Sequence, residues 1–448
     1  MRSFMNSLIS SKQVSLKALI LTVLISLLVF SLALAASGDL DPTFSGDGKL
    51  TTNFGGTLND NARAMAIQSN GKIVVAGTRS QGDVIPPTSS DFAVARYNSN
   101  GTLDTTFSGD GRLTTHFGGL EEALGIAIQG DGRIVVVGQK CSSPDWICDV
   151  AIARYNTNGS LDPTFSGDGR QITDYGGGDN GSYGGVAIQT NGKIVVAGRM
   201  HNGSNYNFAV YRYNANGSLD TTFSGDGGTS TGFAAGWDDD TFGLVLQPDG
   251  KIVVAGRTCT GGWWGSCNFA LARYHSNGSL DLTFSGDGRQ TTNFGGLDYV
   301  NAVARQADGK IVAAGRMENA GVCSLALARY TINGALDTTF SFDGITTTPL
   351  SSTDCAWWHF LGTKIQSDGK IFVAASKGLN GNHDFLLVRY KSNGIRDLTF
   401  SGDGAVFVSF GGDDLADAVA IQPNGRIVIA GWTNFYGDTD FALAGVIP

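Results

Sequence analysis

Of the 448 residues of this chain, 42% are hydrophobic and only nine are proline, which excludes a Pro-rich disordered polymer. The net charge of −9, without any run rich in Lys and Arg, argues against a nucleic-acid partner or an anionic membrane surface. The 64 glycines, beside many Val, Ile, Ala and Thr residues, favour short strands and tight turns over helices.

The first 36 residues differ from the rest of the chain. Three basic residues precede an unbroken apolar run from Ala18 to Ala36. Near its end, Ala33-Leu34-Ala35 has the small-x-small pattern of a secretory cleavage site. We therefore predict a secretory signal peptide over residues 1–36 and a mature protein that is secreted, periplasmic or on the cell surface. The alternative is a retained anchor, because the run approaches the thickness of a bilayer. No later segment is apolar enough to insert into a membrane.

From residue 37 onward a phrase of about sixty residues recurs. One copy, Asn191–Gly227, reads N-G-K-I-V-V-A-G, a loop, and then F-A-V-Y-R-Y-N-A-N-G-S-L-D-T-T-F-S-G-D-G. A D/N-G-[KR]-I element begins at Asn70, Asp131, Asn191, Asp249, Asp308, Asp368 and Asn424. The phenylalanine of T-F-S recurs at Phe44, Phe107, Phe165, Phe223, Phe284, Phe340 and Phe400. Seven copies of one unit therefore fill residues 37–448.

Each copy predicts four short strands. In the first full copy they are Ala62–Gln68, Lys72–Gly77, Phe92–Asn98 and Arg112–Phe117, with alternation of apolar and polar residues. The Asn-Gly or Asp-Gly pair before the second strand is a strong hairpin signal. Stacking such sheets around an axis buries both of their faces, so we predict an all-β, seven-bladed β-propeller of four antiparallel strands per blade. A β-solenoid is the alternative, but its repeats are usually shorter.

The two ends of residues 37–448 carry complementary parts of one unit. Phe441–Val446 resembles a third strand without a fourth, whereas Lys49–Phe54 resembles a fourth strand without the first three. We therefore expect the strand Lys49–Phe54 to complete the last blade and to close the ring as a non-covalent clasp.

Three motifs allow a family resemblance to be stated: L-D-x-T-F-S-G-D-G, D-G-K-I-V-V-A-G and F-A-x-A-R-Y-N-x-N-G. With them, residues 37–448 resemble the delta-60 repeat family of bacterial β-propellers and, less closely, NHL-type propellers. The resemblance implies an exported or surface protein in which the A-I-Q strand is innermost and the T-T-N-F strand outermost. It implies no catalytic residues, because the function of the family is mostly undefined.

Residues that recur in every copy are expected to serve the fold. The Arg of A-R-Y and the Asp of L-D-x-T, such as Arg96 and Asp104, predict Arg–Asp pairs or Asp-capped turns. The Gln of A-I-Q, such as Gln68, is expected to satisfy backbone groups between blades. Because Gly445 replaces the Arg in the last copy, we expect the last blade to lack this pairing.

The loop that enters the first strand and the loop between the second and third strands vary from copy to copy, and chain parity places both on one face. Binding groups on rigid scaffolds usually lie on such loops. The six cysteines fall in them, and in an exported chain an even number indicates disulfides. No Cys/His cluster has the spacing of a zinc site. We predict the pairs Cys141–Cys148, Cys259–Cys267 and Cys323–Cys355.

Aromatic residues concentrate in the same variable loops. Exposed aromatic rings stack on sugars or anchor a protein partner. The alternative is that these rings only plug the loops against the sheets. The candidate ligand-binding residues are Trp146, Tyr206, Trp237, Trp263, Trp264, Trp357, Trp358 and Tyr436.

Acidic residues recur at the entrance to the innermost strand. In a propeller they would surround the mouth of the channel, where carboxylates can hold Ca²⁺ or attract a cationic ligand. Alternatively, each caps its own F-G-G-x-x-D turn. Gly181 and Trp358 interrupt the ring, and no other cofactor is expected. The candidate metal ligands are Asp60, Glu121, Asp239, Asp298 and Asp414.

We predict an exported, monomeric, non-enzymatic binding or scaffold propeller that recognises a glycan or a protein of the extracellular space or cell envelope through the variable-loop face. The alternative is an extracellular or periplasmic propeller enzyme of the lyase, lactonase or glycoside hydrolase type. Against it, the sequence shows no inward-facing His or carboxylate set that departs from the repeat, as an active site would.

Overall fold

The computed structural model describes residues 36–81, 89–142, 147–175, 178–181, 185–261, 265–350, 362–379, 382–435 and 437–448. The chain divides into two units, residues 1–36 and 37–448, and the strands of the described residues belong to the second unit. The predicted signal peptide, apart from Ala36, lies outside the described residues. Within the described ranges, no helix is long and apolar enough to cross a membrane.

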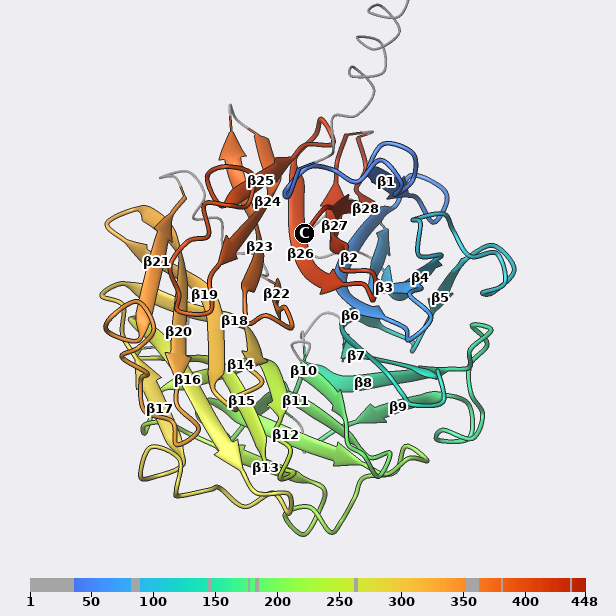
Figure 1. The fold of residues 1–448 in the computed structure, drawn as a ribbon. Helices are drawn as coiled ribbons and strands as arrows, with labels where there is room; N and C mark the ends of the chain where they lie inside the picture. The colour runs from blue at the N-terminus through green and yellow to red at the C-terminus, as the bar shows by residue number, and fades with distance from the viewer. Residues whose placement is uncertain are drawn as a thin grey trace, which may run out of the picture. The chain divides into compact units, whose positions relative to one another are not determined.

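The described part of the second unit is all-β, and its strands repeat in groups of four. We number the sequence repeats 1 to 7 in chain order. The first strands are β2 (Asn59–Ile67), β6 (Leu120–Ile128), β10 (Gly185–Ile188), β14 (Asp238–Leu246), β18 (Leu297–Arg305), β22 (Gly362–Ile365) and β26 (Asp414–Ile421). The second strands are β3 (Ile73–Gln81), β7 (Ile134–Cys141), β11 (Ile194–His201), β15 (Ile252–Cys259), β19 (Ile311–Asn319), β23 (Ile371–Leu379) and β27 (Ile427–Thr433). In Figure 1 the first strands lie on the inner side of the sheets.

The third and fourth strands complete each sheet. The third strands are β4 (Ser89–Tyr97), β8 (Cys148–Tyr155), β12 (Tyr206–Tyr213), β16 (Cys267–Tyr274), β20 (Val322–Tyr330), β24 (Asn382–Tyr390) and β28 (Asp440–Val446). The fourth strands are β5 (Arg112–Thr115), β9 (Arg170–Thr173), β13 (Gly228–Thr231), β17 (Arg289–Thr292), β21 (Ile345–Pro349), β25 (Ala405–Val408) and β1 (Lys49–Thr52). Five sheets have four strands, and a parallel contact between Ser90 and Leu120 merges repeats 1 and 2 into one eight-stranded sheet.

The glycine of V-V-A-G is explained by a bulge in the first strand. The pairing of β2 with β3 shifts by one residue between Ala62 and Ala64, opposite Gly77. A Cβ atom on Gly77 would lie 2.0 Å from the carbonyl oxygen of Asn61, so no side chain fits there. Bulges bend a strand and increase its twist, which suits the innermost strand of a twisted sheet.

The hydrophobic core lies between successive sheets. Val74 and Val94 of repeat 1 pack against Ile134 and Ala153 of repeat 2. The same kind of contact joins the sheet of repeat 1 to the sheet that contains β26, β27 and β28. The sheet of repeat 1 therefore buries its apolar faces against sheets on both sides.

A buried guanidinium links each repeat to the next. The Nε atom of Arg96 donates to Asp104 at 2.6 Å, while its Nη1 atom donates to the carbonyl of Thr157 in repeat 2. Asp104 also accepts from Lys72 and caps the turn at Thr106. The predicted Arg–Asp pairs are thus confirmed, with Nε–carboxylate distances of 2.5–2.9 Å: Arg96–Asp104, Arg154–Asp162, Arg212–Asp220, Arg273–Asp281, Arg329–Asp337 and Arg389–Asp397.

The last sheet contains the predicted chain-end strand, since β1 pairs antiparallel with β28. The expectation that this sheet would lack the Arg–Asp pairing was wrong. Arg426, at the position of Lys72 in repeat 1, donates to Asp41 at 2.6 Å, to Thr43 at 2.6 Å and to the carbonyl of Ser99 at 2.6 Å. A guanidinium from the residue just before β27 thus replaces the one that Gly445 cannot supply.

Because Arg426 has these three acceptors, we predict that Arg426→Lys destabilises the protein more than the exchange of one cation for another would by itself. Lysine can keep the contact with Asp41 but cannot also reach both other acceptors, so we expect a loss of about 1–3 kcal/mol in the free energy of unfolding. Urea denaturation measures it. The control is Lys193→Arg in repeat 3, where Arg212 already fills the role. Equal stability of the two variants would contradict the assignment.

Candidate functional site

At the contact between repeats 1 and 2, three side chains from the two repeats meet. We call them the junction triad. The first precedes the Phe of the third strand, and the second follows the fourth strand. The third is the acid at the start of the first strand of the following repeat. Between repeats 1 and 2 they are Asp91, His116 and Glu121. The His116 Nδ1 atom lies 2.8 Å from Asp91 Oδ1 and 3.1 Å from Glu121 Oε2.

The acids of the predicted ring are fully buried and hydrogen-bond to the preceding turn. Asp60 accepts from the N–H of Phe54 at 2.7 Å, Asp298 from Phe294 at 2.6 Å and Asp414 from Phe410 at 2.6 Å. Asp239 and Glu121 accept from Phe233 at 3.0 Å and from Gly119 at 2.5 Å, respectively. Each acid therefore caps its own turn. A shared ion at the channel mouth stays a prediction.

Burial controls the protonation of these caps. Burial raises the pKa of Asp298 to about 6, although the hydrogen bond from Phe294 opposes the shift. Burial likewise raises the pKa of Asp60 to about 7, where Phe54 and the charge of Arg79 oppose it. Within the described residues, Asp298 Oδ1 has no hydrogen-bond partner. Burial therefore favours the neutral form of Asp298 more than water would.

A pocket of about 390 Å³ opens at the junction between repeats 3 and 4. Here Gly232 follows the fourth strand, and a Cβ atom on it would lie 2.9 Å from Asn207 Oδ1. The absence of a side chain at Gly232 leaves the space. The lining consists of Asn202, Asn205, Asn207, Gly232, Phe233, Ala234, Ala235 and Arg289.

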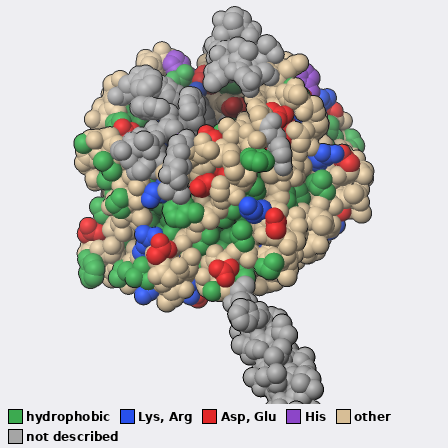
Figure 2. Space-filling view, turned by 90° about the horizontal axis from the view of Figure 1, so that it is seen from above, with side chains coloured by type: hydrophobic (Ala, Val, Ile, Leu, Met, Phe, Trp, Pro, Cys, Tyr) green, Lys and Arg blue, Asp and Glu red, His purple; other side chains and the backbone are tan. Residues whose placement is uncertain are grey.

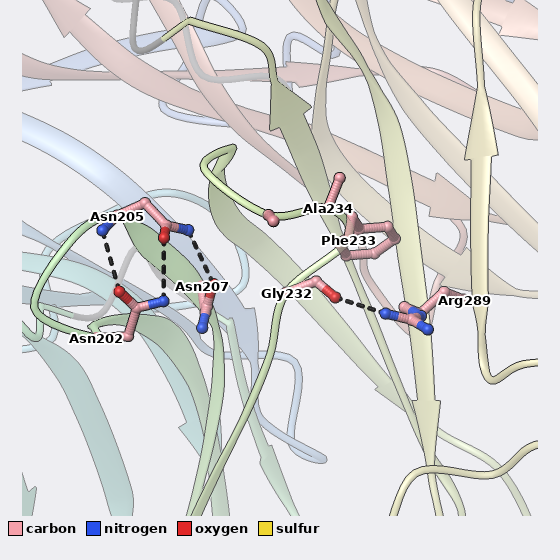
Figure 3. A pocket seen from close by; sticks show the side chains of 8 residues that line it. Asn202, Asn205, Asn207, Gly232, Phe233, Ala234 and Arg289 are labelled. Carbon is pink, nitrogen blue, oxygen red and sulfur yellow. Dashed lines mark hydrogen bonds between the residues drawn. The ribbon is translucent and has the colours of Figure 1, made fainter.

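Three asparagine amides form a chain along this pocket (Figure 3). Asn202 donates to Asn205 at 3.1 Å, and Asn205 donates to Asn207 at 3.2 Å. Opposite them, Arg289 donates to the carbonyl of Gly232 at 2.7 Å, beside the ring of Phe233. Asn205 also donates to the carbonyls of Tyr206 and Trp237, so the capacity for a polar ligand lies with the amides of Asn202 and Asn207.

Two of the eight predicted aromatic residues lie beside this pocket. Tyr206 is half-buried, and the guanidinium of Arg199 lies 4.3 Å from its ring centroid. Trp237 is half-buried, and its carbonyl accepts a short hydrogen bond from Asn205. Trp237 is thus linked to Asn205 through its backbone, whereas the ring of Tyr206 packs against Arg199 and His201. The other candidates lie outside the described residues: Trp146, Trp263, Trp264, Trp357, Trp358 and Tyr436.

An arginine cluster below the variable loops was missed from the sequence. Arg199, Arg257 and Arg316 occupy one position of the second strand in three consecutive repeats, and all three are buried. Arg257 forms a two-bond ion pair with Asp240 at 2.8 and 2.9 Å. Its guanidinium also lies 5.0 Å from the ring centroid of Tyr299. The sequence did contain a signal of this departure from the repeat, because the other repeats have Thr, Gln, Ser or Trp at this position.

The disulfides Cys141–Cys148 and Cys259–Cys267 are confirmed, and each closes the hairpin between the second and third strands. Cys323 is also disulfide-bonded, while its predicted partner Cys355 lies outside the described residues. Two disulfides are typical of an oxidising, extracellular type of environment. On the surface that Figure 2 shows, acidic and basic side chains are interspersed and do not gather into patches of one sign.

The buried carboxyls that cap the turns predict that the free energy of unfolding falls as the pH rises. The pKa of Asp298 is about 6 in the folded protein and 3.8 as a reference, so its contribution is full below pH 3.8 and is lost as pH rises through 6. From pH 5 to pH 8 this loss is about 1 kcal/mol. We expect Asp298→Asn, which keeps an acceptor for Phe294, to flatten the urea-unfolding profile in that range. The exposed control Asp110→Asn should leave the slope unchanged, and equal slopes for both variants would contradict the assignment.

Comparison with solved structures reveals distant likenesses of fold. A protein of unknown function from Dyadobacter fermentans DSM 18053 is 11% identical, with a TM-score of 0.47, over 90% of this chain and 98% of that chain. Drosophila Semaphorin 2a is 10% identical, with a TM-score of 0.49, over 92% and 76%. A glucose dehydrogenase is 11% identical, with a TM-score of 0.41, over 89% and 99%. These likenesses support no inference about function. No curated protein sequence matches the chain.

The sequence itself matches one family in every repeat. The family is described as "Domain of unknown function (DUF5122) beta-propeller". The matched segments are residues 68–107, 129–165, 189–223, 247–284, 306–340, 366–400 and 422–444, together more than half of the chain. The chain therefore belongs to the DUF5122 β-propeller family.

Proposed function

We propose that this chain is an exported, non-enzymatic binding propeller that recognises a glycan at the asparagine-lined pocket between repeats 3 and 4. The pocket carries the proposal. Asn207 and its neighbours offer amide donors and acceptors that match sugar hydroxyls, and Phe233 offers an apolar ring surface. Such a mixture of a few convergent polar groups and an aromatic surface is typical of small-ligand sites.

The neighbouring aromatic residues extend this surface. Trp237 lies on the loop before β14, where its ring can add stacking area for a longer oligosaccharide, and Tyr206 opens the neighbouring strand β12. The hydrogen bond from Asn205 to the carbonyl of Trp237 fixes the two loops relative to each other. A fixed arrangement lowers the entropy lost on binding.

Export is part of the proposal. The two disulfides indicate an oxidising compartment, and the predicted signal peptide over residues 1–36 supplies a route to it. Both disulfides close variable-loop hairpins. They therefore stabilise the loops on the face that we assign to the ligand.

A glycan array with the purified protein, followed by calorimetry with the best oligosaccharide, tests the function. Asn207→Ala and Trp237→Ala should weaken binding at least about tenfold, because they remove a hydrogen-bonding and a stacking group. Asn268→Ala, at the equivalent position of repeat 4, is the matched control and should bind normally. Absence of glycan binding, or equal binding by all variants, would refute the proposal. Trp263→Ala and Trp264→Ala test the neighbouring aromatic pair in the same assay.

We further propose that residues 37–448 form a closed ring of seven blades of the delta-60 type. The support is that the contact between the last sheet and repeat 1 repeats the internal contacts. Tyr97 donates to Thr52 at 2.9 Å, as Tyr155 does to Thr115 at 2.7 Å. The N–H of Ser45 also donates to the carbonyl of Asn100 at 2.7 Å, as its counterparts do elsewhere.

A double-mutant cycle tests the closure. In a closed ring, Tyr97→Phe and Thr52→Val should show a coupling energy of about 0.5–1.5 kcal/mol in urea unfolding. The internal pair Tyr155→Phe and Thr115→Val gives the reference value. A coupling near zero at the first pair, with a normal value at the second, would indicate an open array.

An enzyme is the second candidate, and the arginine cluster favours it. Arg199, Arg257 and Arg316 depart from the repeat in three consecutive sheets, as an active site would. They are buried, however, and Asp240 already pairs with two of them. Turnover of a lactone or polysaccharide that is abolished by Arg257→Gln, at an unchanged melting temperature, would favour the enzyme.

A further inference from the structure

We propose that Asp91, His116 and Glu121 form a binding site for one divalent transition-metal ion, with Zn²⁺ as the expected occupant. The site lies on the variable-loop face at the junction between repeats 1 and 2. It is separate from the asparagine-lined pocket, which lies between repeats 3 and 4.

The ligand atoms already converge. One Asp oxygen, one Glu oxygen and the His Nδ1 atom lie within 4.8 Å of one another. In tetrahedral zinc sites, bonds of about 2.0–2.2 Å place the ligand atoms about 3.3 Å apart. The distances of 2.8 and 3.1 Å from His116 Nδ1 need to open by only a few tenths of an ångström. Because the His116 side chain is 61% exposed, the imidazole has room to make this adjustment.

The two carboxylates are held in place by the backbone. Asp91 lies in β4 next to Ser90, and Glu121 lies in β6 next to Leu120. Ser90 and Leu120 form the parallel contact that joins the two strands, the one such pairing between repeats in the described part of the chain. The other oxygen of Glu121 accepts from the N–H of Gly119, which orients the carboxylate. Such supporting hydrogen bonds are typical of metal ligands.

The histidine is a departure from the repeat. Asn53 and Asn293 occupy the position of His116 at two other junctions. An asparagine there serves the fold, since Asn53 hydrogen-bonds to Asp440, the counterpart of Asp91. The exchange to histidine supplies a nitrogen ligand between two acids. Among the described residues, this is the one group of three His, Cys, Asp or Glu side chains with converging ligand atoms.

The ligand types select the metal. Ca²⁺ prefers six to eight oxygen ligands, whereas an imidazole nitrogen with two carboxylates suits Zn²⁺ and related ions. With three protein ligands, a fourth position remains for water or an external ligand. In the strand register Lys140 of β7 lies opposite Glu121 and Arg79 of β3 lies opposite Asp91, but Arg79 donates to the carbonyl of Gly55 and lies 3.9 Å from Asp60.

Calorimetric titration of the purified, EDTA-treated chain with Zn²⁺ tests the site. We expect one Zn²⁺ per chain and an increase in melting temperature. His116→Asn should weaken binding at least about 100-fold, because it removes a ligand but restores a residue that the fold uses elsewhere. The matched control is His275→Asn, another exchange of an exposed histidine for the residue found in other repeats, which should leave the affinity unchanged. Titration with Ca²⁺ should give no comparable heat.

A variant that introduces a histidine tests the proposal without relying on the loss of metal binding in His116→Asn. Asn53→His places an imidazole between Asp440 and Asp60, and we expect it to create a second Zn²⁺ site. Absence of Zn²⁺ binding by the wild-type chain, or equal affinity in wild type and His116→Asn, would overturn the proposal. In that case His116 acts only as a partner that hydrogen-bonds two carboxylates.

Discussion

A buried guanidinium holds successive repeats together, and its charge sets a constraint on the whole array. Removing an arginine from water is costly unless a carboxylate and further acceptors surround it. Arg96 has these partners in Asp104, in Thr106 and in the carbonyl of Thr157 from the next repeat. The interaction therefore requires both neighbours to be present. It makes the stability of one sheet depend on the next, in addition to the apolar surface that the sheets share.

The last sheet, in which Gly445 stands in place of the third-strand arginine, shows how strict this constraint is. Gly445 lies opposite Val428 in the pairing of β27 with β28, and a Cβ atom there would lie 2.6 Å from the ring of Phe44. The guanidinium is therefore supplied by Arg426, which lies two residues before Val428, just ahead of β27. The sequence shows both Gly445 and Arg426, but only the register of the strands shows that the two positions are close in space. For this reason the repeat pattern predicted the strands correctly and the pairing in the last sheet incorrectly.

The same distinction explains what the sequence revealed of the candidate sites. The hairpin disulfides were predictable, because Cys141 and Cys148 bracket one short loop. The junction triad could not be predicted from the sequence, because its members come from two different repeats. Two of its members also lie within motifs that are nearly constant among the repeats. His116 occupies the Asn position of T-T-N-F, and Gly232 occupies it in repeat 3. A motif averaged over all copies hides the copy in which one position has changed.

A repeat array can tolerate such changes because its stability is divided over many equivalent contacts. At one structural position, Asn53 serves the fold, His116 meets two carboxylates and Gly232 leaves a pocket. All three follow the fourth strand of their sheet, although among the described residues only the junction beside His116 has the parallel pairing of Ser90 with Leu120. A single substitution therefore alters the chemistry of one junction without disturbing the others. The differences among junctions, more than the conserved phrase or the loop aromatics alone, are where this propeller can acquire a function.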